Sequence, residues 1–241
     1  MPEFEVECAE LAGRPAVHRK GRKYPEPRVS GVKNAGELIG EICKGEEITG
    51  VTNGQFSLIH LLAHVLKQIG PADVAISTWT MGIYDSAQAE EWTLNKSIRS
   101  IRFILDPSMF GRRPELSGRL LAAFGVDAFR AVNTHAKFAT LGNDDYQVTV
   151  RSSMNLNPNH RLENFDIAEG PELYAFFVGL VDEIFERFPT GGTETTQSPR
   201  YFSEILAGYE APTRQSADGL PEVIAGEEAD LAALLAGIAD E

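Results

Sequence analysis

The chain has 241 residues, of which 22 are Lys or Arg and 35 are Asp or Glu, so its formal net charge is −13. A hydrophobic fraction of 43% is ordinary for a chain that buries a core, which excludes a disordered acidic protein. The acidic balance also excludes a basic architectural nucleic-acid binder.

Helix and strand patterns alternate between residues 32 and 187. Asn34 and Asp85 are suitable N-caps for the helices that follow them, Pro114 suits the first turn of another helix, and Gly142–Asp145 is typical of a hairpin turn. Such alternation predicts an α/β fold with a mixed β-sheet flanked by helices and a C-terminal helical extension. Strands are expected at 48–52, 73–79, 100–105, 129–133, 137–141 and 146–150, and helices at 34–43, 55–70, 86–97, 115–125 and 171–188.

Composition divides the chain into four parts. Residues 1–31 are expected to form a basic N-terminal arm, which either contacts phosphates or is simply solvated. The main domain spans 32–188, a polar Gly- and Thr-rich linker spans 189–199, and 200–241 is an acidic helical extension. The apolar face of a helix expected within that extension can dock on the domain, mediate assembly or bind another protein.

The compartment is inferred from what the sequence lacks. Its two cysteines are too few for a disulfide scaffold and fit a reducing environment. The acidic N-terminus does not look like a signal peptide, and no apolar run has the length of a membrane span. We therefore expect a cytoplasmic protein without a membrane span.

The residues with the strongest chemical pattern lie between 133 and 167. His135 and Lys137 would share one face of a strand, because side chains alternate along a strand. Such a pair suits a site that binds an anion and attacks it, with Lys supplying charge and His acting as nucleophile or acid and base. Hydroxyl and amide groups that can donate to phosphate oxygens follow at Ser152, Ser153 and Asn155.

These residues resemble the motif of the phospholipase D superfamily, H-x-K-x4-D-x6-G-S-x-N, and residues 161–167 are similar to the acidic segment that follows it in single-motif bacterial nucleases of that superfamily. Two departures stand out. Gly142 occupies the position of the usual Asp, while Asp145 keeps the spacing to Ser152, which indicates a three-residue insertion; Ser152 replaces the usual Gly. A second H-x-K match at His18 is interpreted as chance.

The resemblance implies that 32–188 is a catalytic domain and that the site is shared by a homodimer. One His135 would attack phosphorus and form a phosphohistidine, and the other would protonate the leaving oxygen. Lys137, Ser153 and Asn155 would hold the phosphate, and Glu163 would orient His135. Substrate contacts are expected from Ser152, Arg151, Arg161 and Asn157. Asp166 is the alternative to Glu163 for orienting His135, Asp145 is a further candidate for the site, and neither metal nor cofactor is expected.

The substrate remains open between three classes. An endonuclease on DNA or RNA is favoured by local basic residues, namely Arg112, Arg113, Arg119, Arg151, Arg161 and the 14–28 segment, although the acidic total opposes it. The alternatives are a phospholipase or transphosphatidylase on lipid phosphodiesters, and a decayed phospholipase D-like binding or scaffold protein.

Other notable residues are interpreted structurally. His60 and His64, four residues apart on an expected helix, would need a third ligand to hold a metal, and none is evident. Trp79 and Trp92 are expected to belong to the core.

Overall fold

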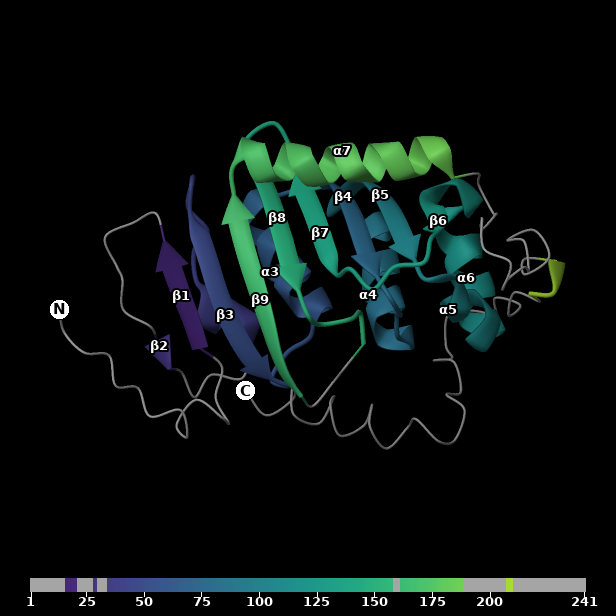
Figure 1. The fold of residues 1–241 in the computed structure, drawn as a ribbon, viewed down its shortest axis with the longest axis horizontal. Coiled ribbons are helices and arrows are strands. Elements are labelled where there is room, and N and C mark those ends of the chain that lie inside the picture. The colour runs from purple at the N-terminus through teal and green to yellow at the C-terminus, as the bar shows by residue number, and fades with distance from the viewer. Residues whose placement is uncertain (1–15, 21–27, 30–33, 158–160, 189–206, 210–241) are drawn as a thin grey trace. The chain divides into compact units, whose positions relative to one another are not determined.

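The computed structural model describes residues 16–20, 28–29, 34–157, 161–188 and 207–209 (Figure 1). The strands are β1 Ala16–Lys20, β2 Arg28–Val29, β3 Glu47–Asn53, β4 Ala72–Thr78, β5 Ile98–Leu105, β6 Phe129–Ala131, β7 Phe138–Gly142, β8 Gln147–Ser152 and β9 Leu162–Glu169. The helices are α2 Ala35–Ile39, α3 Leu58–Ile69, α4 Ile83–Leu94, α5 Pro107–Arg112, α6 Pro114–Phe124, the short 3₁₀ helix η1 Val126–Ala128, and α7 Pro171–Arg187.

The strands form one sheet in the order β2-β1-β3-β9-β8-β7-β4-β5-β6 (Figure 1). β4, β5 and β6 run parallel to one another, whereas β7 pairs antiparallel with both β4 and β8. The mixed sheet with flanking helices confirms the expected fold class. The linker at 189–199 and nearly all of the C-terminal extension lie outside the described residues.

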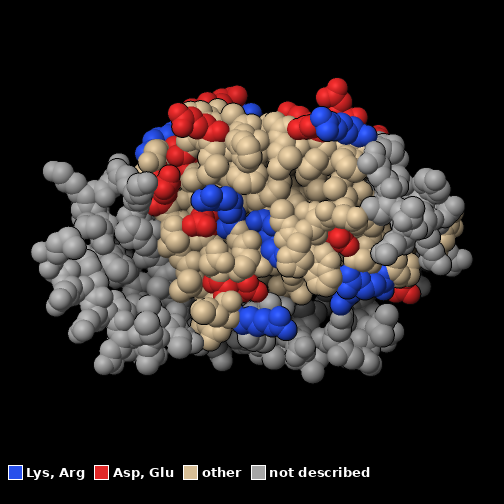
Figure 2. Space-filling model, viewed as in Figure 1, with Lys and Arg blue, Asp and Glu red and all other residues tan. Residues whose placement is uncertain are grey.

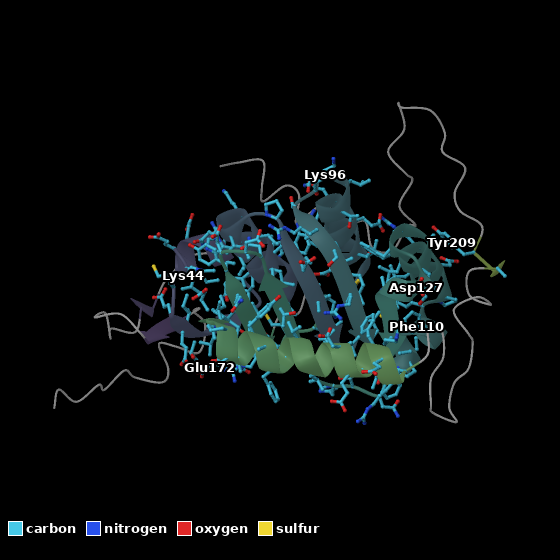
Figure 3. The ribbon with its side chains drawn as sticks, turned by 90° about the horizontal axis from the view of Figure 1, so that it is seen from above. Lys44, Lys96, Phe110, Asp127, Glu172 and Tyr209 are labelled. Atoms are coloured by element: carbon cyan, nitrogen blue, oxygen red, sulfur yellow. The ribbon has the colours of Figure 1, made fainter. Side chains whose placement is uncertain are left out.

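Helices cover both faces of this sheet. The alternation of side chains along β4 sends Val74 and Ile76 into the larger core, together with residues of α3, α4 and α6. Ala75 points the other way and packs with Phe138 and Val181 under α7. Figure 3 shows α7 along one face, with Lys96, just after α4, on the opposite side.

Most expected elements are present, with shifts at their ends. The helix that Asn34 caps ends at Ile39, four residues early, because Gly40 adopts a positive φ and closes the helix. Residues of the expected N-terminal arm form β1 and β2, with β1 pairing along β3. β9 and α5 were not expected.

The start of α4 differs from the expectation in a way that buries a carboxyl group. The helix begins at Ile83 with Gly82 as N-cap, so Asp85 lies inside the first turn and not at the cap. Its side chain is fully buried and accepts a long hydrogen bond of 3.5 Å from the Ser57 hydroxyl. Burial raises the pKa of Asp85 to about 7.

Asp85 should therefore make stability depend on pH in an unusual direction. Its pKa is higher in the folded chain than the ordinary value near 3.9, so this group favours folding at low pH and loses that contribution as the pH rises to about 7. The loss is at most about 4 kcal/mol, at 1.36 kcal/mol per pKa unit. Urea unfolding of wild type and Asp85→Asn from pH 5 to 8 should show the variant gaining stability relative to wild type.

The exposed Asp73→Asn provides the matched control for loss of one carboxylate. A difference between wild type and Asp85→Asn that stays constant from pH 5 to 8 would contradict the assignment.

Candidate functional site

A group of polar side chains gathers where β4 ends and β7 begins. His135 and Lys137 lie in the extended segment just before β7, and not on the strand itself as expected. Ser153 follows the end of β8, and Glu163 lies at the start of β9. Because β8 runs antiparallel to β7 and β9, the end of β8 and the starts of β7 and β9 lie side by side. They are at the lower ends of the strands in Figure 1.

The backbone of this segment is fixed by two hydrogen bonds to neighbouring strands. The Ser77 hydroxyl of β4 donates to the carbonyl oxygen of Ala136 at 3.0 Å, and the amide of Ser152 donates to the carbonyl oxygen of Lys137, also at 3.0 Å. The residues between β6 and β7 are therefore tied to the sheet from both sides.

His135 and Lys137 touch each other. The Lys137 ammonium lies 3.1 Å from Nδ1 of His135 and donates to the His135 carbonyl oxygen at 2.7 Å. Lys137 is only 8% exposed, whereas His135 is exposed to solvent. Burial lowers the pKa of Lys137, and the negative charge of Glu163 acts in the opposite direction. The site thus offers a nearly buried cation behind an accessible imidazole.

This contact also sets the protonation of the ring. An ammonium group can only donate, so Nδ1 of His135 accepts and a neutral ring carries its proton on Nε2. For Nε2 to attack a substrate, that proton must first move to Nδ1. The contact between Lys137 and Nδ1 must therefore open before His135 can act as a nucleophile.

Ser153 connects Glu163 to this group. Its hydroxyl donates a short hydrogen bond to Oε2 of Glu163 and accepts from the Asn164 amide at 3.0 Å. The Ser152 hydroxyl donates to the Asn164 carbonyl oxygen at 2.8 Å and accepts from the Met154 amide at 2.9 Å. Both hydroxyls thus hold the end of β8 against β9, and the expected donation by Ser152 to a phosphate would require it to leave the Asn164 carbonyl.

Asn155 lies beside the end of β4. Its Oδ1 is 3.5 Å from the Thr78 hydroxyl, whose proton has a closer acceptor in the Thr80 carbonyl oxygen at 2.9 Å. The amide nitrogen of Asn155 makes no hydrogen bond within the described part of the chain, so it is available as a neutral donor.

Three of the expected residues are placed away from this group. Asp145 lies in the β7–β8 turn, at the opposite end of β7 from His135. Arg151 is paired with Phe138 on one side and Asp166 on the other, so both charged residues stand on the sheet face that α7 covers. Asp166 accepts from the Thr49 hydroxyl at 2.7 Å. The structure does not bring these three residues to His135.

Asn157 belongs to a different environment. It lies near Gly82, where Oδ2 of Asp85 also approaches, and its own Oδ1 is buried with no hydrogen-bond partner in the described structure. Arg161 is exposed just before β9. Neither residue makes a contact with His135 or Lys137 that the structure records.

Two residues that the sequence pattern did not single out for this site are present. Trp92 is buried as expected, but Trp79, directly after β4, is half-buried and its ring centroid lies 5.8 Å from that of His135. The Arg112 guanidinium carbon lies 4.6 Å from the centroid of the Trp79 ring. Their positions after neighbouring parallel strands offer the signal that could have found them, since ligands bind outside the carboxyl ends of such strands.

The second H-x-K match cannot join this group. His18 is on β1, which is separated from β7 by β3, β9 and β8. Four strand spacings amount to about 19 Å. His60 and His64 are also engaged elsewhere, since His60 completes the capping box of α3 and His64 lies 2.7 Å from the Gly40 carbonyl oxygen.

The described residues contain no group of three or more His, Cys, Asp or Glu that could hold a metal ion. In the same part of the chain, no helix combines the length and the apolar character that crossing a bilayer requires.

No protein-family model and no curated protein matches the chain. Among solved structures it is similar to Nuc from Salmonella typhimurium, a phospholipase D family member, at 12% identity and a TM-score of 0.38, over 54% of this chain and 90% of that one. It is also similar to NucT from Helicobacter pylori, at 12% identity and a TM-score of 0.40, over 60% and 99% of the two chains. Phosphatidylserine synthase from Haemophilus influenzae matches at 12% identity and a TM-score of 0.42, over 66% and 41%.

Gly142, which occupies the position of the usual Asp, is closely approached by a side chain of α7. A Cβ at this position would lie 2.1 Å from the hydroxyl and 2.4 Å from Cζ of Tyr174 on α7. Gly142→Asp, which introduces the residue usual in the motif, should therefore displace Tyr174 and destabilise the fold by about 1–3 kcal/mol. Urea unfolding measures the loss.

The double variant Gly142→Asp, Tyr174→Ala supplies the control, because it removes the obstructing ring. It should be less destabilised than the sum of the two single changes. Unchanged stability in Gly142→Asp would show that Tyr174 does not require glycine here.

Proposed function

We propose that this chain is a metal-independent phosphodiesterase that acts through a phosphohistidine at a site shared by two copies. The observation that carries the proposal is the nearly buried Lys137 ammonium in contact with the exposed His135 ring. A cation in such a place favours an anionic ligand, and the ring beside it can act as a nucleophile near neutral pH.

Binding of the substrate prepares the nucleophile. A phosphate oxygen is a stronger acceptor for an ammonium group than a neutral imidazole, so the substrate draws Lys137 away from Nδ1 of His135. The ring can then carry its proton on Nδ1, and the Glu163 carboxylate accepts a hydrogen bond from this N–H group and fixes the ring. The effect of Glu163 on Lys137 and its hydrogen bond from Ser153 support this role.

The reaction then proceeds in two displacements. Nε2 of His135 forms a bond to phosphorus as the bond to the leaving oxygen breaks, and His135 of the second copy gives that oxygen a proton. The second His135 next takes a proton from water, whose oxygen attacks phosphorus and breaks the phosphorus–nitrogen bond. Lys137 and the amide of Asn155 stabilise the charge that builds on the non-bridging oxygens.

Dimerisation is proposed because this chemistry needs two histidines in each site. One histidine must attack while another protonates the leaving oxygen. In the described part of the chain His135 is the histidine of this group, since His18, His60 and His64 lie elsewhere, and His160 lies outside the described residues. Two-fold symmetry is the commonest oligomeric arrangement and would supply the second histidine.

The proposed substrate is DNA or RNA. Eight of the 13 net negative charges belong to residues 201–241, where one basic residue accompanies nine acidic ones. On the face in Figure 2 the described surface is mostly uncharged, and its basic side chains stand in separate groups. Such a surface fits a local phosphate-binding mouth better than broad attraction to a polyanion.

The chemistry is tested by an assay panel with EDTA present throughout. Wild type should cleave single-stranded DNA, double-stranded DNA or RNA, and also bis-p-nitrophenyl phosphate, while phosphatidylcholine should remain intact. His135→Ala should lower kcat on every cleaved substrate by at least about a thousandfold, because the covalent route is lost. The exposed position of His135 should leave the unfolding midpoint unchanged.

Cleavage that survives in His135→Ala would overturn the proposed nucleophile. Activity on phosphatidylcholine alone would replace the nuclease assignment by a lipid-directed one, and no cleavage of any diester would favour a binding protein.

The shared site is tested by subunit mixing. Wild type and His135→Ala are denatured together in equal amounts and refolded, so that about one quarter of the dimers contain two intact chains. Activity per total protein should fall to about one quarter if both histidines are needed in each site. Mixing with Arg187→Ala, a change on α7, is the matched control and should leave activity unchanged.

A fall to only one half, the value for independent sites, would contradict the shared arrangement. So would an active species with the mass of a monomer in solution.

A further inference from the structure

Three side chains from separate segments form a row along the edge of the sheet that carries His135. Trp79 follows β4, Arg112 ends α5 after β5, and His135 precedes β7. The Trp79 ring neighbours both of the others, with its centroid 5.8 Å from that of the His135 ring and 4.6 Å from the Arg112 guanidinium carbon. The row places a cation beside the reacting histidine, on the side away from β8 and β9.

Arg112 is held in place without being neutralised. Its Nε donates to the Ser108 carbonyl oxygen at 3.3 Å, its Nη2 donates to the Ser108 hydroxyl, and its guanidinium lies over the Trp79 face. None of the described carboxylates forms an ion pair with it. Arg102 and Arg119, in contrast, each pair with a carboxylate, to Asp182 at 2.6 Å and to Glu90 at 2.9 Å.

The spacing of the row suits a polymer. The two separations place the Arg112 guanidinium at most about 10 Å from the His135 ring, while each strand of duplex DNA carries a phosphate about every 3.4 Å along the helix axis. With one phosphate at His135, a phosphate a few nucleotides along the strand can reach Arg112. A lipid or small diester has no such second phosphate.

We infer that Arg112, supported by Trp79, binds a non-scissile phosphate of a nucleic-acid strand and thereby makes the site selective for polymers over single diesters. The inference rests on the proposed function and deepens it. The unused guanidinium donors can contact two phosphate oxygens at once, and the support of Trp79 and Ser108 lowers the entropy lost on binding. Arg112 is a specificity residue here, because its proposed contact is with a phosphate other than the one that His135 attacks.

The test separates polymer recognition from the chemical step. The kcat/KM of Arg112→Ala is measured on a 20-residue single-stranded oligodeoxynucleotide and on bis-p-nitrophenyl phosphate. It should fall about tenfold on the oligonucleotide, the effect of losing one charged contact, and stay within about twofold on the small diester. Arg112→Lys keeps the charge and should recover part of the loss. Arg187→Ala, which removes an arginine from α7, should change neither value.

Binding supplies an independent readout. In a His135→Ala background, where no cleavage is expected, anisotropy of a fluorescent oligonucleotide gives Kd at several salt concentrations. Adding Arg112→Ala should weaken binding about tenfold and reduce the slope of log Kd against log salt by about 0.7, the value for one phosphate contact on a single strand.

The outcomes distinguish this inference from the proposed function. An equal loss on both substrates, or unchanged oligonucleotide binding in the Arg112→Ala variant, overturns the inference while the phosphodiesterase assignment stands. Cleavage of the small diester by wild type without cleavage of any oligonucleotide also overturns it. Absence of all cleavage, together with binding that depends on Arg112, overturns the proposed chemistry and upholds the phosphate contact.

Discussion

The candidate site depends on one contact, between the nearly buried Lys137 ammonium and Nδ1 of His135 at 3.1 Å. Burying an ammonium group is costly unless hydrogen bonds and a nearby negative charge compensate. The carbonyl oxygen of His135 and the charge of Glu163 provide both kinds of compensation. Two hydrogen bonds help to hold that arrangement, one from the Ser77 hydroxyl to the Ala136 carbonyl oxygen and one from the Ser153 hydroxyl to Glu163. The same contact keeps the resting histidine in its non-nucleophilic tautomer, so binding of an anion would be what activates it.

Local patterns in the sequence were sufficient for most of the fold. Alternating β-formers predicted β3, β4 and β5, and Pro114 marked the start of α6, because these features act through nearest neighbours. They failed where a distant residue decides the outcome. Asp85 is a good N-cap by composition, yet α4 starts at Ile83 and buries it. β9 was not predicted because polar residues such as Glu163 and Asp166 interrupt the apolar pattern expected of a strand in the middle of the sheet.

The sequence likewise predicted only part of the candidate site. The resemblance to the motif grouped His135, Lys137, Ser153 and Glu163, and the structure has them at the same end of the sheet. It could not predict that Arg151 and Asp166 face α7, because the face of a residue depends on register. Trp79 was taken for core because composition alone cannot tell a buried indole from one beside a histidine. Gly142 was interpreted as part of an insertion, and sequence alone could not predict that Tyr174 of α7 closely approaches it.

The central claim is that His135 becomes covalently attached to phosphorus. The most direct measurement mixes wild type with bis-p-nitrophenyl phosphate, quenches in alkali within the first turnover, and maps the adduct by mass spectrometry of the peptide that contains His135. One p-nitrophenyl phosphoryl group is expected on a ring nitrogen of His135, and this adduct should be stable in alkali and lost in acid. Attachment to any other residue, or turnover of the diester with no adduct on His135 at any quench time, would contradict it.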